Sequence, residues 1–399
     1  MVVEMRNDTV RLAWLTASLF IAYLAVATAL PVIPIYVSHG LHFSNSLGGL
    51  AVGISFLSTI LTRGYAGKFA DTYGAKKCVW RGFACYGVAS LLCLVSTWHG
   101  LHPWVAYALL IVGRLLLGLG ESQALVGINL WGIGLLGPSH SGRVMAWVGA
   151  GMYGAFAVGS VLGVGVYQHT GIVVVMTLGV ILPLIGWLIS IPIPAAKPTR
   201  SKSNAQPPFV KIVGQVFKPG AVVCLQGIGF AVIGAFCSLY FMQQHWGYAG
   251  TGLTFFGCGF VISRLLFGSL PDRIGGIKVA LLSIIVEAIG QYMLWLAPNL
   301  YFGLAGALLT GLGCSMIFPS MGIVVVKEIP AHIRGSALGA FSAFQDLAYG
   351  ISAPITGIVA DHYGYGSVFA IGGVAATVGV VLIIRMALVR RQQEVSQSA

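Results

Sequence analysis

Twelve long apolar runs, separated by short polar segments, set the strongest limit on how this chain can fold. Each run is close to the roughly 20 residues that a helix needs to cross the hydrocarbon core of a bilayer. A helix also satisfies its own backbone hydrogen bonds where no water is available. The sequence therefore predicts an all-α membrane protein with twelve transmembrane helices, at 12–36, 45–69, 79–98, 104–130, 144–166, 172–194, 219–241, 250–270, 278–297, 301–326, 335–359 and 366–389.

Composition indicates a lipid environment rather than a soluble fold. Of the residues, 57% are hydrophobic and only 8% are charged, whereas a soluble domain carries about 25% charged residues. The net charge of +12 is compatible with a nucleic-acid partner, but nineteen of the 22 Lys and Arg residues lie in alternate loops and at the termini. This distribution is the positive-inside pattern, so we expect a lipid bilayer, and no nucleic acid, around the chain.

The loops near 38–44, 98–103, 167–171, 242–249, 298–300 and 360–365 contain no Lys or Arg. Because basic residues are retained on the cytoplasmic side, we expect both termini to be cytoplasmic. Seven of the nine His residues lie in these outer loops, spread over five of them, and the seven Cys residues form no CxxC pair. We therefore expect no metal site, no disulfide framework and no cofactor.

A motif recurs at a fixed distance along the chain. Four residues of the segment 63–77 have identical counterparts 201 positions later: Arg63 and Arg264, Gly67 and Gly268, Asp71 and Asp272, and Gly74 and Gly275. The segments 138–143 and 330–334 also resemble each other, since both contain Pro, His and Arg. The repeats predict two related halves, 1–194 and 213–399, joined by a polar, Pro-rich and basic cytoplasmic linker at 195–212.

The pattern G-x-x-x-D-x-x-G followed by basic residues, after the second apolar run, resembles the signature of the major facilitator superfamily of transporters. The R-x-x-x-G-x-G pattern that begins at Arg114 resembles a motif of its proton-coupled members. The resemblance implies two pseudo-symmetric six-helix bundles with a substrate site between them. It is closest to bacterial twelve-span antiporters that exchange drugs or metabolites for protons, including sugar-efflux-like permeases of the YhhS type. It therefore implies a bacterial inner-membrane protein.

The same resemblance implies a gate at the repeated motif. Asp71 and Asp272 would brace neighbouring helix ends, and Gly67 and Gly268 would allow close helix packing. The first copy departs from the family pattern at Thr72 and Ala75, where basic residues are usual, so we expect a weaker brace there. The expected gating set is Arg63, Gly67, Asp71, Gly74, Arg264, Gly268, Asp272, Arg273 and Gly275.

Four ionisable residues lie deep within apolar runs, where a charge is costly and is a functional candidate by default. Arg114 lies ten residues into its run, about 15 Å deep, and Glu121 follows two turns later on the same face. Asp346 and Glu287 lie near the middle of two later runs. All four are proton-coupling candidates. The alternative is a structural role, as an ion pair or a polar contact between helices, and this is favoured for Glu287 because its span is peripheral in the resembled family.

Polar residues within the runs are candidates for a central substrate cavity: Tyr23, Asn129, Gln226, Tyr240, Gln243, Ser315 and Gln345. Proline predicts helix breaks at Pro31 and Pro34, Pro319 and Pro354. The long run from residue 104 to 136 is also expected to bend or to leave the membrane near Gly132 or Gly134.

These observations predict a monomeric secondary transporter that exports a small organic solute in exchange for protons by alternating access. A proton-coupled importer of a small metabolite is the main alternative, and a transporter-like sensor is a weaker one. We expect no enzymatic activity and no use of ATP, because the sequence contains no HExxH, GxSxG or P-loop motif. The G-x-G-x-x-G match at 149–154 follows no strand and precedes no acidic residue at ribose spacing, so it does not indicate a dinucleotide site.

Overall fold

The computed structural model describes residues 8–137, 140–196, 209–247, 250–330 and 334–398, and the regular structure within these ranges is entirely helical. The chain divides into two compact units, Met1–Lys202 and Ser203–Ala399. Most of the linker expected at 195–212 lies outside the described residues, as do parts of the 138–143 and 330–334 segments. Residues 209–212 of that linker belong to the first helix of the second unit.

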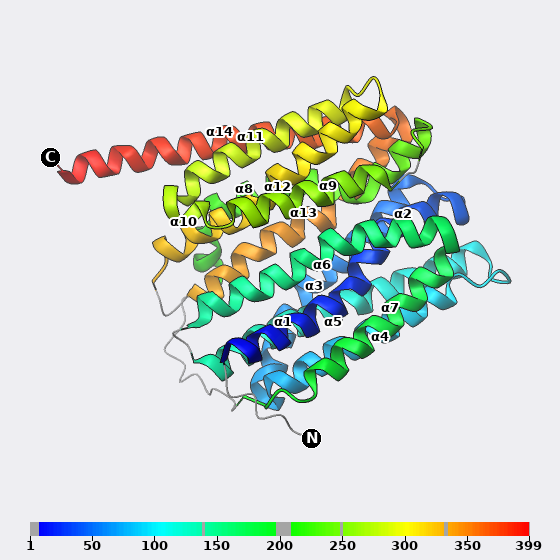
Figure 1. The fold of residues 1–399 in the computed structure, drawn as a ribbon, viewed down its shortest axis with the longest axis horizontal. Helices are drawn as coiled ribbons and strands as arrows, with labels where there is room; N and C mark the ends of the chain where they lie inside the picture. The colour runs from blue at the N-terminus through cyan, green and yellow to red at the C-terminus, as the bar shows by residue number, and fades with distance from the viewer. Residues whose placement is uncertain (1–7, 138–139, 197–208, 248–249, 331–333, 399) are drawn as a thin grey trace. The chain divides into compact units, whose positions relative to one another are not determined.

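The first unit contains six long helices and two short elements. Its elements are α1 (Asp8–Ala29), α2 (Val32–Ile35), the π-helix η1 (Tyr36–Gly40), α3 (Asn45–Tyr73), α4 (Ala75–Val95), α5 (Pro103–Leu136), α6 (Ser141–Thr170) and α7 (Ile172–Ser190). Helix α1 packs against α6 and α7, α5 packs against both α3 and α4, and α4 also contacts α7 (Figure 1). Helix α5 therefore reaches the interior of this unit, where α1, α3 and α4 surround it.

The second unit has the same arrangement of neighbours. Its elements are α8 (Phe209–Gln243), α9 (Thr251–Phe267), α10 (Leu270–Ile274), α11 (Gly276–Trp295), α12 (Leu300–Glu328), α13 (Arg334–Tyr363) and α14 (Tyr365–Ser398). Helix α8 packs against α13 and α14, α12 packs against α9 and α11, and α11 contacts α14. The order of the helices and their contacts reproduce those of the first unit, as a duplicated architecture requires.

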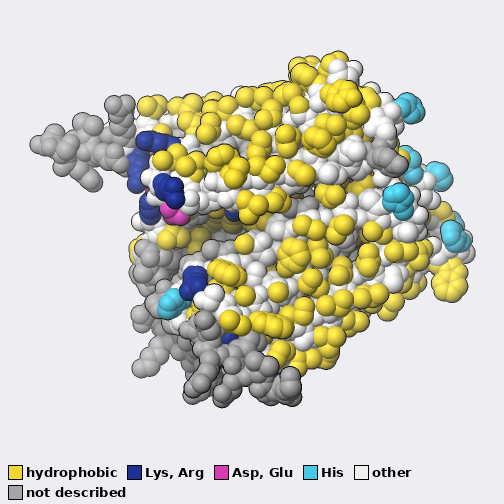
Figure 2. Space-filling model, in the orientation of Figure 1, with side chains coloured by type: hydrophobic (Ala, Val, Ile, Leu, Met, Phe, Trp, Pro, Cys, Tyr) yellow, Lys and Arg dark blue, Asp and Glu magenta, His cyan; other side chains and the backbone are white. Residues whose placement is uncertain are grey.

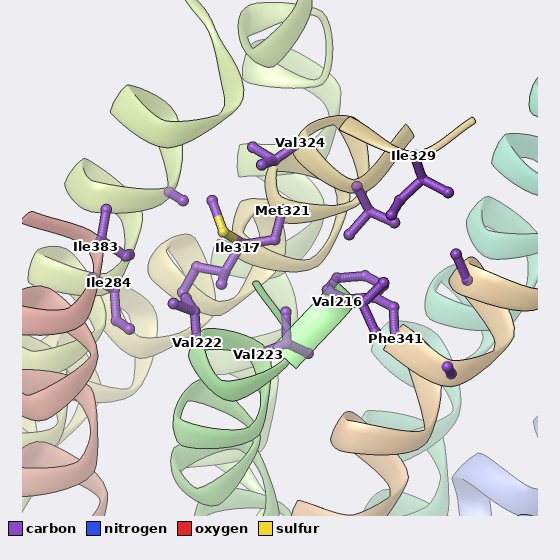
Figure 3. Packing of buried hydrophobic residues seen from close by; sticks show 14 of the residues in the cluster. Val216, Val222, Val223, Ile284, Ile317, Met321, Val324, Ile329, Phe341 and Ile383 are labelled. Atoms are coloured by element: carbon purple, nitrogen blue, oxygen red, sulfur yellow. The ribbon is translucent and has the colours of Figure 1, made fainter. Parts of the chain in front are cut away.

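Apolar side chains form the core where these helices meet. In the second unit, Val223 from α8, Ile284 from α11, Met321 from α12, Phe341 from α13 and Ile383 from α14 belong to one buried cluster (Figure 3). Each helix contributes one apolar stripe to the cluster, and other apolar side chains of the same helices remain exposed. Apolar surface of this kind is stable against lipid but not against water.

Ten helices are long and apolar enough to cross a membrane among the residues that the structure describes, and α9 is a shorter apolar helix. Helix α13 is 30 residues long but carries Gln345 and Asp346 in its middle, which lower its hydropathy. Figure 2 shows a largely hydrophobic face, and on each unit the visible Lys and Arg side chains gather at one end of the helices. The predicted all-α membrane architecture is confirmed.

Several expected helix breaks are wrong. The first span does break at Pro31, but Pro34 lies inside α2, and Pro319 and Pro354 lie inside the continuous helices α12 and α13. Membrane helices tolerate proline because neighbouring groups satisfy the backbone carbonyls that it frees. Helix α5 likewise continues through the expected bend at Gly132 and Gly134 and ends at Gly137, which has a φ of +92°.

Candidate functional site

A buried carboxyl group lies at a junction of helices in the first unit. Glu121 on α5 is 3% exposed. Its Oε1 accepts a hydrogen bond from the hydroxyl of Tyr23 on α1. Its Oε2 lies 3.2 Å from Oγ1 of Thr59 on α3, whose one hydroxyl proton can go to this oxygen or to the carbonyl oxygens of Ser55 and Gly118. Both donors stabilise the ionised form, because hydrogen bonds to a carboxylate are charge-assisted. The junction is therefore built to hold a negative charge.

Arg114 supplies a cation to the same interior. It is 1% exposed, and its Nε donates to the carbonyl oxygen of Ala51 at 3.0 Å while Nη2 donates to Oγ of Ser55 at 2.9 Å. Both acceptors belong to α3. Gly118, one turn further along α5, makes this approach possible, because a Cβ at that position would collide with the carbonyl oxygen of Ser55.

The spacing of the R-x-x-x-G-x-G pattern thus has a structural cause. The glycine lets α3 lie close to α5, and the arginine uses that proximity to reach the backbone of α3. Arg114 and Glu121 interact electrostatically, and both bond to α3, as expected for residues two turns apart on one face. The arrangement places a cation and an acid in the same buried interior.

Three polar groups near this junction are buried without a hydrogen-bond partner among the described residues. They are the hydroxyl of Tyr86 on α4, the hydroxyl of Ser122 and both side-chain amide atoms of Gln123. Tyr86 also interacts electrostatically with Glu121. Buried polar groups are normally paired, so each exception needs an explanation. These residues, like Thr59 and Ser55, do not stand out in the sequence, because a polar residue in an apolar run carries no signal of which helix it faces.

The second unit has a different buried carboxyl group. Glu287 on α11 is fully buried, and among the described residues no N–H or O–H group donates to either of its carboxyl oxygens. The thiol of Cys314 on α12 is its polar neighbour, and that thiol also interacts with Gln226 on α8. One turn along α11, Nε2 of Gln291 donates to the carbonyl oxygen of Gly229 at 3.0 Å.

Glycines bring the helices around Glu287 close together. A Cβ at Gly229 of α8 would lie 2.5 Å from Oε1 of Glu287, and a Cβ at Gly313 of α12 would lie 2.5 Å from the carbonyl oxygen of Ser283. Both distances are too short for real atoms. The carboxyl group is therefore enclosed by backbone and lies among α8, α11 and α12.

Asp346 has a third environment, because it is only partly buried on α13. Its neighbour Gln345 donates from Nε2 to the hydroxyl of Tyr349 at 2.7 Å, and the ring of Tyr349 stacks on Phe230 of α8 at a centroid distance of 5.0 Å. Of the three acids in the apolar runs, Asp346 is the most accessible.

The repeated motif forms the same backbone turn in both units. Gly74 ends α3 with a φ of +92°, and Gly275 ends α10 with a φ of +97°, a region that favours glycine. Asp71 and Asp272 are exposed on the preceding turns, and the guanidinium of Arg264 lies 5.6 Å from the centre of the Phe260 ring.

Close helix packing at the motif glycines is not seen. A Cβ at Gly67 would meet no atom within 4 Å, and one at Gly268 would meet only the backbone of Arg264, in its own preceding turn. Neither glycine therefore packs closely against another helix of its own unit, and the expected packing stays a prediction. In both units the motif ends a helix and turns the chain, at Gly74 and at Gly275. The side chain of Arg63 is partly buried and that of Arg273 is exposed.

Basic and aromatic residues after the first motif connect the helix ends, which the sequence did not show. Nζ of Lys76 donates to the carbonyl oxygens of Ile191 and Ile193 at 2.8 and 2.6 Å, and so caps the end of α7. The guanidinium of Arg81 on α4 bonds to the hydroxyl of Tyr65 on α3 at 2.7 Å. The first motif is therefore fastened within its own unit.

The cavity candidates separate into three groups. Tyr23, Gln226, Tyr240, Ser315 and Gln345 are buried, Asn129 is partly buried and Gln243 is exposed at the last residue of α8. Ser315 donates to the carbonyl oxygen of Phe260 at 2.8 Å, which joins α12 to α9. Tyr240 packs its ring against Trp246 and Phe369. Gln243 is therefore not one of the interior polar groups. Tyr23 and Gln226 are the two candidates that lie beside the buried acids.

Comparison with known proteins agrees with this architecture. The sequence profile described as Major Facilitator Superfamily matches residues 15–249 and 221–399. An uncharacterized MFS-type transporter of Salmonella typhimurium is 42% identical over 377 residues, covering 94% of this chain and 96% of the relative. One from Burkholderia mallei is 37% identical over 394 residues, covering 98% of this chain and 95% of the relative.

Solved structures share the fold at low sequence identity. The nucleoside transporter NupG has a TM-score of 0.76 at 14% identity, covering 95% of this chain and all of that one. A D-xylose-proton symporter also has a TM-score of 0.76, at 15% identity, covering 94% and 96% of the two chains. The family profile extends over both units, and the relatives span nearly the whole sequence. This chain belongs to the Major Facilitator Superfamily of membrane transporters.

Proposed function

We propose that this transporter exports a small organic solute across the bacterial inner membrane in exchange for protons, by alternating access. The observation that carries the proposal is the junction at Glu121, where Tyr23 and Thr59 donate to a buried carboxylate. Ionisable residues in the membrane interior are costly and are usually functional. A carboxylate that holds three helices together through hydrogen bonds is a suitable place for a proton to act.

Protonation of Glu121 would change the contacts of the junction. An ionised carboxylate accepts hydrogen bonds from both hydroxyls, whereas a neutral acid is itself a donor and has fewer acceptor sites. Its interaction with Arg114 would also lose the negative partner. Binding of one proton therefore weakens the links from α5 to α1 and α3, which is the kind of change that a conformational cycle needs.

Asp346 is the proposed second coupling residue. Because it is partly exposed on α13, a proton or a substrate can reach it more easily than the enclosed Glu121. The neighbouring Gln345, Tyr349 and Phe230 provide one polar and two aromatic contacts for an organic solute. We place the substrate near this group, with the coupling protons on Asp346 and Glu121.

The remaining features are proposed in line with this mechanism. The halves 1–194 and 213–399 would move relative to each other about the linker, with both termini in the cytoplasm and the protein working as a monomer. Proton-driven import is the second candidate, and it is supported by the shared fold with a D-xylose-proton symporter.

The direction of transport can be tested in everted membrane vesicles, whose interior is acidified by respiration. A thermal-shift screen of the purified protein with nucleosides, sugars, organic anions and cationic dyes first selects a solute. Export by antiport predicts that this solute accumulates inside the vesicles and that a protonophore abolishes the accumulation. Depletion from everted vesicles, with accumulation in right-side-out vesicles, would instead establish import.

A further inference from the structure

The two units can be aligned residue by residue from their internal contacts. Gly118 meets the carbonyl oxygen of Ser55, and Gly311 meets that of Phe256. The two glycines, Gly118 and Gly311, are 193 positions apart in the sequence, and the two residues that they meet, Ser55 and Phe256, are 201 positions apart. These offsets relate α5 to α12, and α3 and α4 to α9 and α11.

Two further contacts give the same alignment. A Cβ at Gly120 would lie 2.9 Å from the carbonyl oxygen of Gly82, and Gly313 faces Ser283 in the same way. Gly186 on α7 faces Ala22, while Gly379 on α14 faces Leu225. The last pair relates α1 to α8 with an offset of 203.

The alignment places the two buried acids at equivalent helix junctions but at different positions within them. It pairs Tyr23 with Gln226, Tyr86 with Glu287, and Glu121 with Cys314. Each set of three surrounds one point, at which three helices of its unit meet. Each junction contains one carboxyl group, but the two groups stand on helices that are not equivalent. The first is on α5, which corresponds to α12, and the second is on α11, which corresponds to α4.

We propose that this position in the second unit is a separate proton-binding site, with Glu287 held there as a neutral carboxylic acid. The proposal stands on the geometry of the junction and relies on the proposed function only for its role in transport. Glu121 has the hydroxyl groups of Tyr23 and Thr59 and a guanidinium nearby, whereas the polar neighbour of Glu287 is the thiol of Cys314, which is only a weak donor. Burying an unpaired carboxylate costs several kcal/mol, and binding a proton removes that charge.

The groups that face Glu287 favour a proton over a metal ion. From α12 the titratable neighbour is Cys314, from α8 come Gln226 and Gly229, and from α11 comes Gln291. No charged side chain of the described residues interacts with it. A Cβ at Gly229 would lie 2.5 Å from Oε1 of Glu287 and 3.0 Å from Nε2 of Gln291, so there is little room for an ion beside this oxygen, and the nearby amide nitrogen is a donor that would repel a cation. A sodium ion needs several oxygen ligands, whereas a proton needs one acceptor and no space.

Infrared spectroscopy of the purified protein in nanodiscs tests this site without any substrate. The chain contains five Glu residues, so labelling with 13C-glutamate separates their carbonyl bands from those of Asp. At neutral pH we expect a band from a protonated Glu that persists in Glu121→Gln and is lost in Glu287→Gln. Exchange of the pair, Glu287→Cys with Cys314→Glu, retains all side-chain volume and should keep the band.

Three results would overturn the proposal. The first is the absence of a protonated Glu band in the labelled wild-type protein at neutral pH, which needs no variant and so does not depend on folding. The second is persistence of the band in Glu287→Gln. The third is loss of the band on adding NaCl at constant pH, which would show a sodium site. Failure of solute export in vesicles with the band intact would reject only the transport proposal.

Discussion

The two units place a buried acid at the same helix junction but surround it differently. In the first unit, Tyr23 and Thr59 donate to Glu121, and Arg114 lies on the same helix. In the second, Glu287 is enclosed by Gly229 and meets a thiol. The fold thus fixes where an acid is placed, and the number of hydrogen-bond donors decides whether it carries a charge. A transporter with two equivalent junctions can bind and release a proton at one of them, Glu121, and keep a proton bound at the other, Glu287.

The largest expected effect comes from removing the cation of the first junction. Arg114→Ala should abolish transport and destabilise the protein by about 3 kcal/mol, because it leaves a buried carboxylate without its cation. Arg114→Lys keeps the charge but loses the two-point contact with α3, so it should retain partial activity. Transport assays in vesicles measure the activity of both variants, and thermal unfolding measures their stability. Full activity in both would show that the first junction has only a structural role.

The accessible acid of the second unit is the next test. Asp346→Asn should abolish proton-coupled transport while leaving the melting temperature unchanged, since the side chain is partly exposed and its shape is retained. Solute-driven proton flux in proteoliposomes, together with binding of the solute by thermal shift, separates coupling from binding. Unchanged flux would remove Asp346 from the mechanism.

A smaller effect should follow from taking one donor away from Glu121. Tyr23→Phe removes a hydrogen bond to the ionised form, which is worth about 1.5–3 kcal/mol. The ionised form is thereby disfavoured, so the pH for half-maximal transport should rise. Tyr240→Phe, in the second unit, is the matched control and should leave the pH profile unchanged. A downward shift for Tyr23→Phe would contradict the account.

The smallest effect on folding is expected at the motif glycine. Gly67→Val meets no neighbouring atom, so its melting temperature should stay close to that of the wild type. Gly118→Ala, which would collide with the carbonyl oxygen of Ser55, should lower the melting temperature clearly. Loss of transport in a stable Gly67→Val variant would show that α3 packs closely in another conformation. Normal transport would mean that this glycine is needed only for the local backbone.

Sequence alone predicted the helices well because hydrophobicity follows the chain locally. Gly74 and Gly275 were also predictable, since a repeated glycine after a helix indicates a positive φ. The junctions were not predictable in the same way, because contacts between helices determine which polar groups meet. Tyr86 was missed although the motif offset of 201 leads from it directly to Glu287. A motif glycine such as Gly67 indicates that close approach is possible, not that it occurs in every state.

The central claim is that solute leaves in exchange for protons. Proteoliposomes that contain a trapped pH-sensitive dye and the purified transporter measure this directly, with no pH gradient imposed and the selected solute added outside. The account predicts that solute entry drives protons out, so that the interior becomes alkaline, and that Asp346→Asn shows no such change. Solute entry that acidifies the interior, or that moves no protons at all, would contradict it.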